Sequence, residues 1–270
     1  MLYDILFESA WETLQTFGKN KNLQMGMIAV LHTWGQNLSL HPHLHCIVPG
    51  GGVDESGTWK NLRSDGKFLF PVKALSKVFR AKFCEKLKAN LKDKFNENQE
   101  NEYEKIRQSL WEKPWVVYAK KPFGSPKSVV EYLGRYSHKI AVSNQRIRKI
   151  DAETVTFSYK DYRQKGIKKQ MVLSHEEFIR RFAMHILPKR FVKIRHYGFL
   201  SSTWKRIKLK NLQQKLGIQP KEKLPPKVFQ PKCSCCKVGN LVTIATFDLR
   251  GPPQWFLEMS QNLSAPKSAF

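Results

Sequence analysis

The sequence predicts an α+β fold, in which an antiparallel sheet is covered by amphipathic helices and is followed by a basic helical C-terminal part. Segments rich in β-branched and aromatic residues near residues 25–62 and 154–173 have the pattern of short strands. Segments with apolar residues at three- and four-residue steps surround them, as in amphipathic helices. This order, in which strands and helices do not alternate regularly, favours an antiparallel sheet.

The first elements include two strands that should pair. Residues 1–17 predict an amphipathic helix, which lacks the basic flank and cleavage site of a signal peptide. Residues 25–34 predict a strand, and a polar loop returns the chain into a second strand at residues 40–48, so an antiparallel pair is expected. The glycine triplet at residues 50–52 ends the second strand.

Short strands and a long helix follow the glycines. Residues 58–62 and 67–70 predict strands, and residues 72–95 predict a long amphipathic helix with a Lys-rich outer face. Residues 96–103 are polar and predict a loop, whereas residues 115–119 predict a buried strand.

A helix carrying two tyrosines should begin at Ser125. This residue is a suitable N-cap and is followed by proline, so a helix is expected as far as Ile140. On it, Tyr132 and Tyr136 lie about 40° apart on one face. The tyrosines should lie at the margin of the apolar stripe, which comprises Val129, Val130, Leu133 and Ile140.

Downstream, a hairpin and a capped helix are predicted. Residues 154–159 and 170–173 should pair across a basic turn. Ser174 then caps a helix over residues 176–186, with Glu177 completing a capping box.

The histidine pair His43 and His45 suggests a metal site. Residues two apart on a strand share a face, and two neighbouring imidazoles form a natural clamp for a divalent ion. Alternatively, each is a hydrogen-bonded structural histidine. The third ligand stays open. His41 shares the parity of the pair but precedes the bend at Pro42, His32 on the neighbouring strand is preferred, and carboxylates remain candidates.

The tyrosines also have two interpretations. They are either packed interface aromatics with wet hydroxyls or nucleophiles whose phenol pKa, ordinarily about 10, is lowered by adjacent cations. Arg135 and Lys139 lie beside them, and His138 could contact phosphate.

Taken together, these motifs resemble the two-tyrosine rolling-circle transposases of bacterial insertion sequences, a branch of the HUH endonuclease superfamily. His43-Leu44-His45 resembles the histidine, hydrophobic, histidine signature, Tyr132 and Tyr136 resemble the Tyr-x-x-x-Tyr motif, and Tyr136 to Lys139 fits Tyr-x-x-Lys. The resemblance covers most of residues 2–256. It is also carried by residues 30–36, 49–52, 132–144, 178–182 and 195–198.

The resemblance implies a fold and a mechanism. Residues 1–150 would form an HUH-like catalytic core, with the histidine pair on a central strand and the tyrosine helix packed against it. Residues 151–218 would form a basic C-terminal part, and residues 219–270 a linker and Cys-containing tail. Mg²⁺ or Mn²⁺ at the histidines would polarise a phosphate of single-stranded DNA, at element ends or target. A tyrosine, assisted by Lys139, would then form a 5′-phosphotyrosine.

The chain departs from the family in one respect. Relatives usually carry an N-terminal zinc-binding segment, followed by a strand of the catalytic sheet, and neither is recognised in these 270 residues, so a truncated copy is expected. The alternatives are therefore a truncated, inactive DNA-binding remnant, or a metal-dependent phosphoesterase that uses activated water.

Charge favours a nucleic-acid partner independently of the motifs. The formal net charge is +25, and residues 160–230 hold 19 Lys or Arg against 4 Asp or Glu, interleaved with aromatics. The predicted DNA contacts are Arg135, Arg180, Arg181, Lys193, Arg195, Lys205 and Arg206.

The remaining features concern the tail and the compartment. A Lys- and Pro-rich linker at residues 219–231 precedes Cys233 and Cys236, a Cys-x-x-Cys pair that could be half of a Zn²⁺ site. Five unevenly spread cysteines do not form a disulfide framework, and the sequence contains no apolar run long enough for a membrane span. A cytoplasmic, DNA-associated protein is expected.

Overall fold

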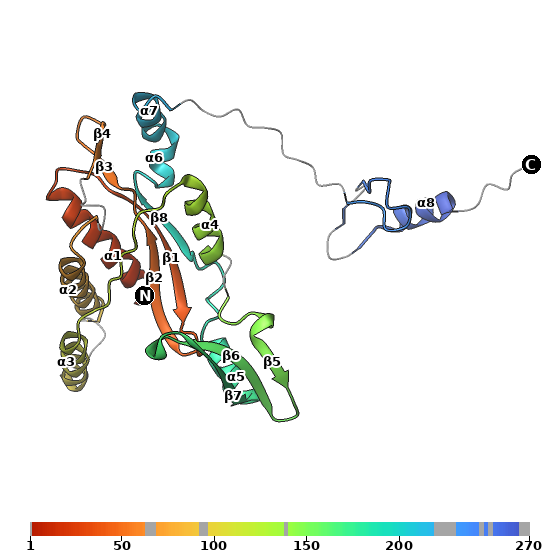
Figure 1. Ribbon diagram of the computed structural model, residues 1–270, viewed down its shortest axis with the longest axis horizontal. Helices are drawn as coiled ribbons and strands as arrows, with labels where there is room; N and C mark the ends of the chain where they lie inside the picture. The colour runs from red at the N-terminus through yellow and green to blue at the C-terminus, as the bar shows by residue number, and fades with distance from the viewer. Residues whose placement is uncertain are drawn as a thin grey trace, which may run out of the picture. The chain divides into compact units, whose positions relative to one another are not determined.

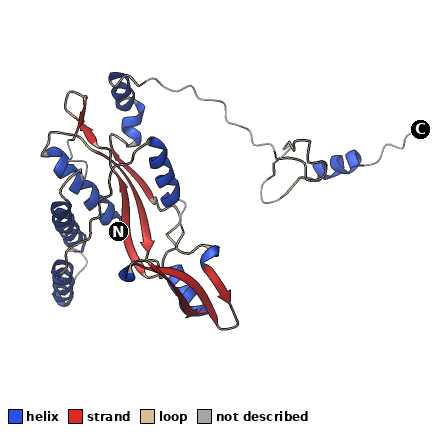
Figure 2. Ribbon diagram, in the orientation of Figure 1, coloured by secondary structure: helices blue, strands red, loops and turns tan. Residues whose placement is uncertain are grey.

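The computed structural model describes residues 2–62, 69–91, 97–137, 140–218, 231–242, 246–247 and 251–264. The chain divides into two compact units, Met1–Gln219 and Pro220–Phe270. The first unit mixes helices with three small antiparallel sheets, which confirms the predicted α+β class (Figure 2). In the second, the described residues include one helix, α8 (Gln254–Ser264).

The main sheet has three strands, β1 (Gly26–Trp34), β2 (Leu40–Ile47) and β8 (Ile194–Gly198), in the order β2-β1-β8 (Figure 1). The predicted antiparallel pair β1–β2 is confirmed, with His32 opposite His43 and Val30 opposite His45. The prediction that the histidine pair lies on a central strand is wrong for the described sheet. β1 is the central strand, because β8, a strand from far along the chain, pairs with its other side, and β2 therefore lies at the edge.

The two faces of this sheet are covered by different helices. Met27, Ala29 and Leu31 of β1 form a buried cluster that includes Phe7 and Leu14 of α1 (Leu2–Lys19). Because side chains alternate along a strand, Val30 and His32 point to the other face. There the histidines contact α4 (Pro126–Ser137), and Figure 1 shows α1 and α4 on opposite sides of the strands.

Two further helices extend the α1 layer. α2 (Val72–Leu91) packs on α1, where Ile5 and Leu87 share a small core and Lys86 pairs with Glu12 at 2.7 Å. α3 (Glu97–Glu112) follows, with Leu110 against the same core.

A second sheet packs on the end of the β1–β2 hairpin. It comprises β5 (Ile147–Ile150), β6 (Thr154–Asp161) and β7 (Ile167–Ser174), followed by α5 (His175–Ala183). The predicted hairpin β6–β7 is confirmed. Two 3-10 turns also belong here, η1 (Asn144–Arg146) and η2 (Tyr162–Gln164).

The predicted cap of α5 is present, because the Ser174 hydroxyl accepts a hydrogen bond from the backbone N–H of Glu177 at 3.3 Å. The Glu177 carboxylate accepts hydrogen bonds from Arg180 and Arg181, each at 2.6 Å. These bonds lower the pKa of Glu177 to about 2, and the hydrogen bond from Arg180 contributes most. The carboxylate thus ties the first turn of α5 to the second.

Three side chains bind backbone carbonyls of the β1–β2 turn. Arg146 donates to the carbonyl of Gln36, Arg181 to that of Asn37 at 3.4 Å, and His185 to that of Leu38 at 3.2 Å. These bonds join the second sheet and α5 to the hairpin that carries the histidines.

Two predicted elements are wrong. Residues 97–112 form α3, whereas residues 96–103 were expected to be a loop. The prediction relied on the spacing of apolar residues and did not count the high helix propensity of Glu, Gln, Lys and Arg in this segment. Residues 115–119 form no strand, and Val116 is 91% exposed. Trp115 instead packs on Phe79 and Phe83 of α2, so this segment follows the surface.

The remaining elements complete the first unit. β4 (Trp59–Asn61) confirms a strand within residues 58–62, and it pairs with β3 (Gly51–Val53), which the sequence did not predict. The strand predicted at 67–70 lies partly outside the described residues, and residues 69–70 are not a strand. Short helices α6 (Ser202–Arg206) and α7 (Lys208–Lys215) follow β8, but residues 219–230 of the predicted linker lie outside the described residues. No described helix combines the length and apolar character needed to cross a membrane.

Gly198 should be essential for the junction of β8 with the start of β1. It has a φ of +58°, and a Cβ there would lie 1.8 Å from the carbonyl oxygen of Met25. We expect Gly198→Ala to lower the free energy of unfolding by about 2–4 kcal/mol in urea titrations. Gly134→Ala is the control, because Gly134 lies in α4 with open space around its Cα; unchanged or higher stability is expected there. Equal effects at the two sites would contradict this assignment.

Candidate metal and tyrosine site

Three histidines converge on the α4 face of the sheet. His32, 2% exposed, lies on β1 opposite His43, and His45 follows two residues later on the same face of β2. One ligating atom from each can be chosen so that all three lie within 4.8 Å of one another, and the part of the chain that the structure describes holds no other such group of three.

Hydrogen bonds orient two of these rings. Nδ1 of His43 donates to the carbonyl of His41 at 2.8 Å, and Nε2 of His32 donates to the carbonyl of Tyr136 at 2.9 Å. In a neutral imidazole, the second nitrogen then carries the lone pair that a metal requires. Trp34 stacks on His32 with ring centroids 4.6 Å apart, which further restricts the orientation of the His32 ring.

The donor set fits a divalent transition ion. Nitrogen ligands bound at about 2.1 Å lie up to ~4 Å apart around one ion, so small side-chain rotations would bring the three nitrogens into range. Neutral imidazoles suit transition ions better than Mg²⁺, which prefers oxygen ligands. In this arrangement His32, and not the imidazole of His41, completes the group with His43 and His45.

Both tyrosines of α4 face this histidine cluster. The Ser125 hydroxyl accepts a hydrogen bond from the N–H of Ser128 at 3.3 Å, which confirms the predicted cap. The hydroxyl oxygen of Tyr132 lies 3.2 Å from Nδ1 of His45, and the ring centroid of Tyr136 lies 4.0 Å from that of His45. The two phenol rings are 4.3 Å apart.

The apolar stripe predicted for the tyrosine helix is buried only in part. Val129 and Leu133 are half-buried, as are both tyrosines, whereas Val130 and Ile140 are 68% and 58% exposed. α4 presents its tyrosines to the sheet, where His45 offers a polar partner to the hydroxyl of Tyr132 and the Tyr136 ring packs on the His45 ring.

The protein groups around Tyr132 disfavour its phenolate. Burial, and then repulsion by Tyr136, raises the pKa of Tyr132 to about 12. This is opposite to the lowering that was expected from Arg135 and Lys139. Arg135 is exposed on α4, and Lys139 and His138 lie outside the described residues. A positive charge placed near this hydroxyl would favour its phenolate.

The predicted DNA-binding residues occupy different surroundings. Arg180 and Arg181 pair with Glu177, and Arg195 pairs with Asp4 at 2.5 Å while its guanidinium lies 4.2 Å from the ring centroid of Phe7. These arginines have evident structural partners.

Two other predicted contacts, Lys205 and Arg206, lie in α6, which follows β8 in the chain. Burial, and to a smaller extent the positive charge of Lys205, lowers the pKa of His196 on β8. His196 pairs with Ile28 and so shares the parity of His32. Arg206, the next residue of α6, is exposed.

Sequence reasoning missed two neighbours of the site. Trp34 stacks on His32, and Phe123 packs on Tyr132 with centroids 5.2 Å apart. The spacing of Trp34 from His32, two residues on one strand, could have indicated the first contact. Phe123 precedes the tyrosine helix, and no local pattern marks its contact. Lys193, a predicted DNA contact, has its ammonium 5.3 Å from the Trp34 ring centroid, so it lies beside the site.

The Cys-x-x-Cys pair lies in the second unit. Cys236 Sγ accepts a hydrogen bond from the N–H of Gly239 at 3.3 Å, and backbone N–H groups lower the pKa of this thiol. These features would favour a thiolate, but no third and fourth ligand group accompanies the pair among the described residues.

Comparison with known proteins identifies a class for this fold and site. Residues 26–207, which include the three histidines and both tyrosines, match the family model Y2_Tnp, "Putative transposase". The chain therefore belongs to the Y2_Tnp transposase family.

Two relatives support this membership. The chain is 39% identical to "Putative transposase y4qJ" of Sinorhizobium fredii (strain NBRC 101917 / NGR234), over 94% of this chain and 70% of the relative. It is 30% identical to "Transposase for insertion sequence element IS801" of Pseudomonas savastanoi pv. phaseolicola, over 74% of this chain and 49% of the relative. The match thus spans about half the length of the second relative. No solved structure matches the chain significantly.

Metal binding should depend on His32 and not on the imidazole of His41. We expect His32→Ala to weaken Mn²⁺ binding in isothermal titration calorimetry by more than about 100-fold, since even loss of an outer-shell partner costs 10–100-fold. His41→Ala is the matched control and should bind Mn²⁺ as the wild type does, because its backbone carbonyl, which orients His43, is kept. The reverse result would assign the third ligand to His41.

Proposed function

We propose that this chain is a two-tyrosine HUH-type transposase, which cuts and rejoins single-stranded DNA through a 5′-phosphotyrosine. The observation that supports this most strongly is the contact between the histidine cluster and both phenols, brought together from β1, β2 and α4. Membership in a transposase family and the net charge of +25 agree with a DNA substrate.

The chemistry follows from the groups present. His32, His43 and His45 would hold a divalent transition ion, with Mn²⁺ the candidate best matched to this imidazole set among the two ions expected. Such an ion would supply Lewis-acid polarisation of the scissile phosphate. The hydroxyl oxygen of Tyr132 or Tyr136 would attack phosphorus, and the bond from phosphorus to the 3′ oxygen would break. The phenol loses one proton and the leaving 3′ oxygen gains one, which gives a free 3′-hydroxyl.

The raised pKa of Tyr132 is compatible with this role. A phenol that stays neutral until metal and DNA are present would not react prematurely, and a cation close to His45 would favour its phenolate. Because the phosphotyrosine keeps the energy of the phosphodiester, the strand can be rejoined without ATP. Two adjacent phenols would allow donor and target strands to be held in succession.

The tyrosine pair should be required for a covalent adduct but not for binding. Purified protein would be incubated with Mn²⁺ and labelled single-stranded DNA from an element end, then run on a denaturing gel. We expect Tyr132→Phe, Tyr136→Phe to abolish the protein-linked strand while changing the affinity for DNA less than about threefold, because the rings are kept.

The same gel distinguishes the alternatives. Tyr162→Phe is the matched control, since Tyr162 is a 70% exposed tyrosine in the turn η2 between β6 and β7, and this variant should form the adduct normally. Metal-dependent cleavage without an adduct would indicate a phosphoesterase that uses water. Binding with neither cleavage nor adduct would indicate an inactive DNA-binding protein.

Lys205 and Arg206 should contribute phosphate contacts near the histidine face. We expect Lys205→Gln, Arg206→Gln to reduce the slope of log affinity against log salt concentration by about 1.4, at roughly 0.7 per phosphate contact on single strands. Fluorescence anisotropy at several salt concentrations measures this slope. Arg107→Gln is the control, because Arg107 pairs with Glu104 on α3, and an equal loss there would argue against a local contact.

A further inference from the structure

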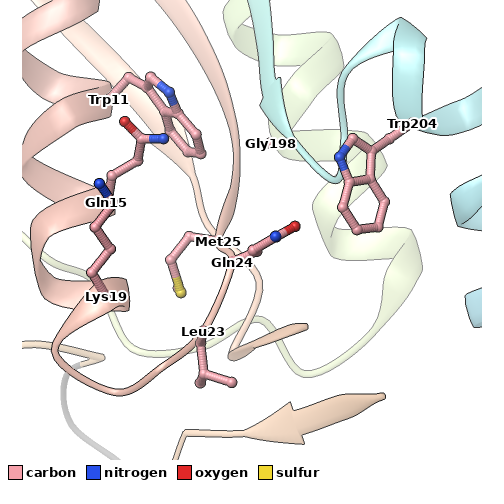
Figure 3. A pocket seen from close by; sticks show the side chains of 8 residues that line it. All are labelled: Trp11, Gln15, Lys19, Leu23, Gln24, Met25, Gly198 and Trp204. Carbon is pink, nitrogen blue, oxygen red and sulfur yellow. The ribbon is translucent and has the colours of Figure 1, made fainter. Parts of the chain in front are cut away.

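A cavity of about 310 Å³ lies at the end of the main sheet, between α1 and the segment that follows β8. Figure 3 shows Trp11, Gln15 and Lys19 of α1 on one side and Trp204 of α6 on the other, with Gln24 and Met25 between them. Its eight lining residues are Trp11, Gln15, Lys19, Leu23, Gln24, Met25, Gly198 and Trp204.

Neighbouring contacts hold both tryptophans in place. Trp11 stacks on Tyr197 with ring centroids 5.2 Å apart and planes inclined by 19°. Trp204 packs edge-on against Phe199, and the ammonium of Lys208 lies 5.0 Å from its ring centroid. Gly198 lets the strand approach closely, because a Cβ there would lie 2.8 Å from the Trp11 ring. The walls are therefore prearranged for a flat ligand.

The polar groups of the cavity match a nucleobase attached to a phosphate chain. Gln15 and Gln24 each carry a carbonyl acceptor and an amide donor, the groups that base edges pair with. Lys19 supplies a positive charge, and none of the eight lining residues is a carboxylate. The volume is at the lower end of the range for ligand sites, about 300–1,000 Å³.

We infer that this cavity receives one unpaired base of the DNA strand that is processed at the histidine and tyrosine site. β8 connects the two places, because it pairs with β1, which carries His32, and its last residue, Gly198, lines the cavity with Trp204 of α6. A phosphate bound at Lys205 would bring an adjoining base to Trp204. Stacking on an indole is sequence-tolerant, and the two amides add a preference for certain base edges. The inference rests on the proposed function in taking single-stranded DNA as the substrate and the histidine and tyrosine site as the place where it is processed.

The test compares strands with and without bases. The probes are a fluorescein-labelled 20-nucleotide single strand of mixed sequence and a fully abasic strand of the same length, bound by the full chain in EDTA. We expect Trp204→Ala to weaken binding of the base-bearing strand about tenfold or more and binding of the abasic strand less than about twofold. The slope of affinity against salt should not change, because phosphate contacts remain.

Two further variants make the test decisive. Trp255→Ala removes a 63% exposed tryptophan of the second unit and should bind both strands as the wild type does. Gln24→Leu replaces an exposed side chain, so the fold should tolerate it, and it should weaken binding of the base-bearing strand alone and change the ranking of homopolymer strands. If Trp204→Ala and Gln24→Leu weaken both strands equally, or weaken neither, the cavity does not hold a base.

The outcome is separable from that of the adduct experiment. Binding in EDTA needs neither metal nor tyrosine chemistry, so a chain that forms no phosphotyrosine can still show the base-dependent loss. Conversely, normal adduct formation together with base-independent binding would overturn the cavity assignment alone.

Discussion

The register of the β1–β2 pair is the constraint on which the rest of the site depends. It places His32 directly opposite His43 and leaves His45 on the same face. A slip of one residue would turn both histidines of β2 toward the apolar cluster under α1. The turn that sets this register is held from outside, since Arg146, Arg181 and His185 all donate to its carbonyls. The second sheet and α5 therefore serve the site without contributing a ligand to it.

Burial gives the site its chemical character. His32 is almost fully enclosed by Trp34, the two other histidines and Tyr136, so a cation there would be poorly screened by water. The same enclosure raises the pKa of Tyr132 to about 12, which keeps the phenol neutral when no cation is near. One low-dielectric environment thus disfavours the phenolate in isolation and strengthens its attraction to a bound metal ion. The expectation that surface cations activate the phenol neglected this desolvation.

Local patterns predicted the local parts of the structure well. The β1–β2 pair, the capped tyrosine helix, the β6–β7 hairpin and the Ser174 cap all follow from residues near one another in the sequence. The pairing of β8 with β1 and the approach of Lys193 to Trp34 do not, because they join segments separated by more than half of the chain. At residues 115–119 the local pattern was misleading, because apolar residues predicted a buried strand. In the structure only the Trp115 ring packs on α2, and the segment forms no strand.

β8 links the basic C-terminal part to the strands that carry the histidines. Arg195 points to the α1 face, where it binds Asp4 and covers Phe7, while His196 points to the histidine face. Gly198 then turns the chain over Met25 into α6. The face that carries the candidate catalytic groups, the basic residues of α6 and the cavity beside Trp204 are consequently fixed to one another through a single short strand. If one DNA strand contacted all three, the position of its base in the cavity would limit which phosphate reaches the tyrosines.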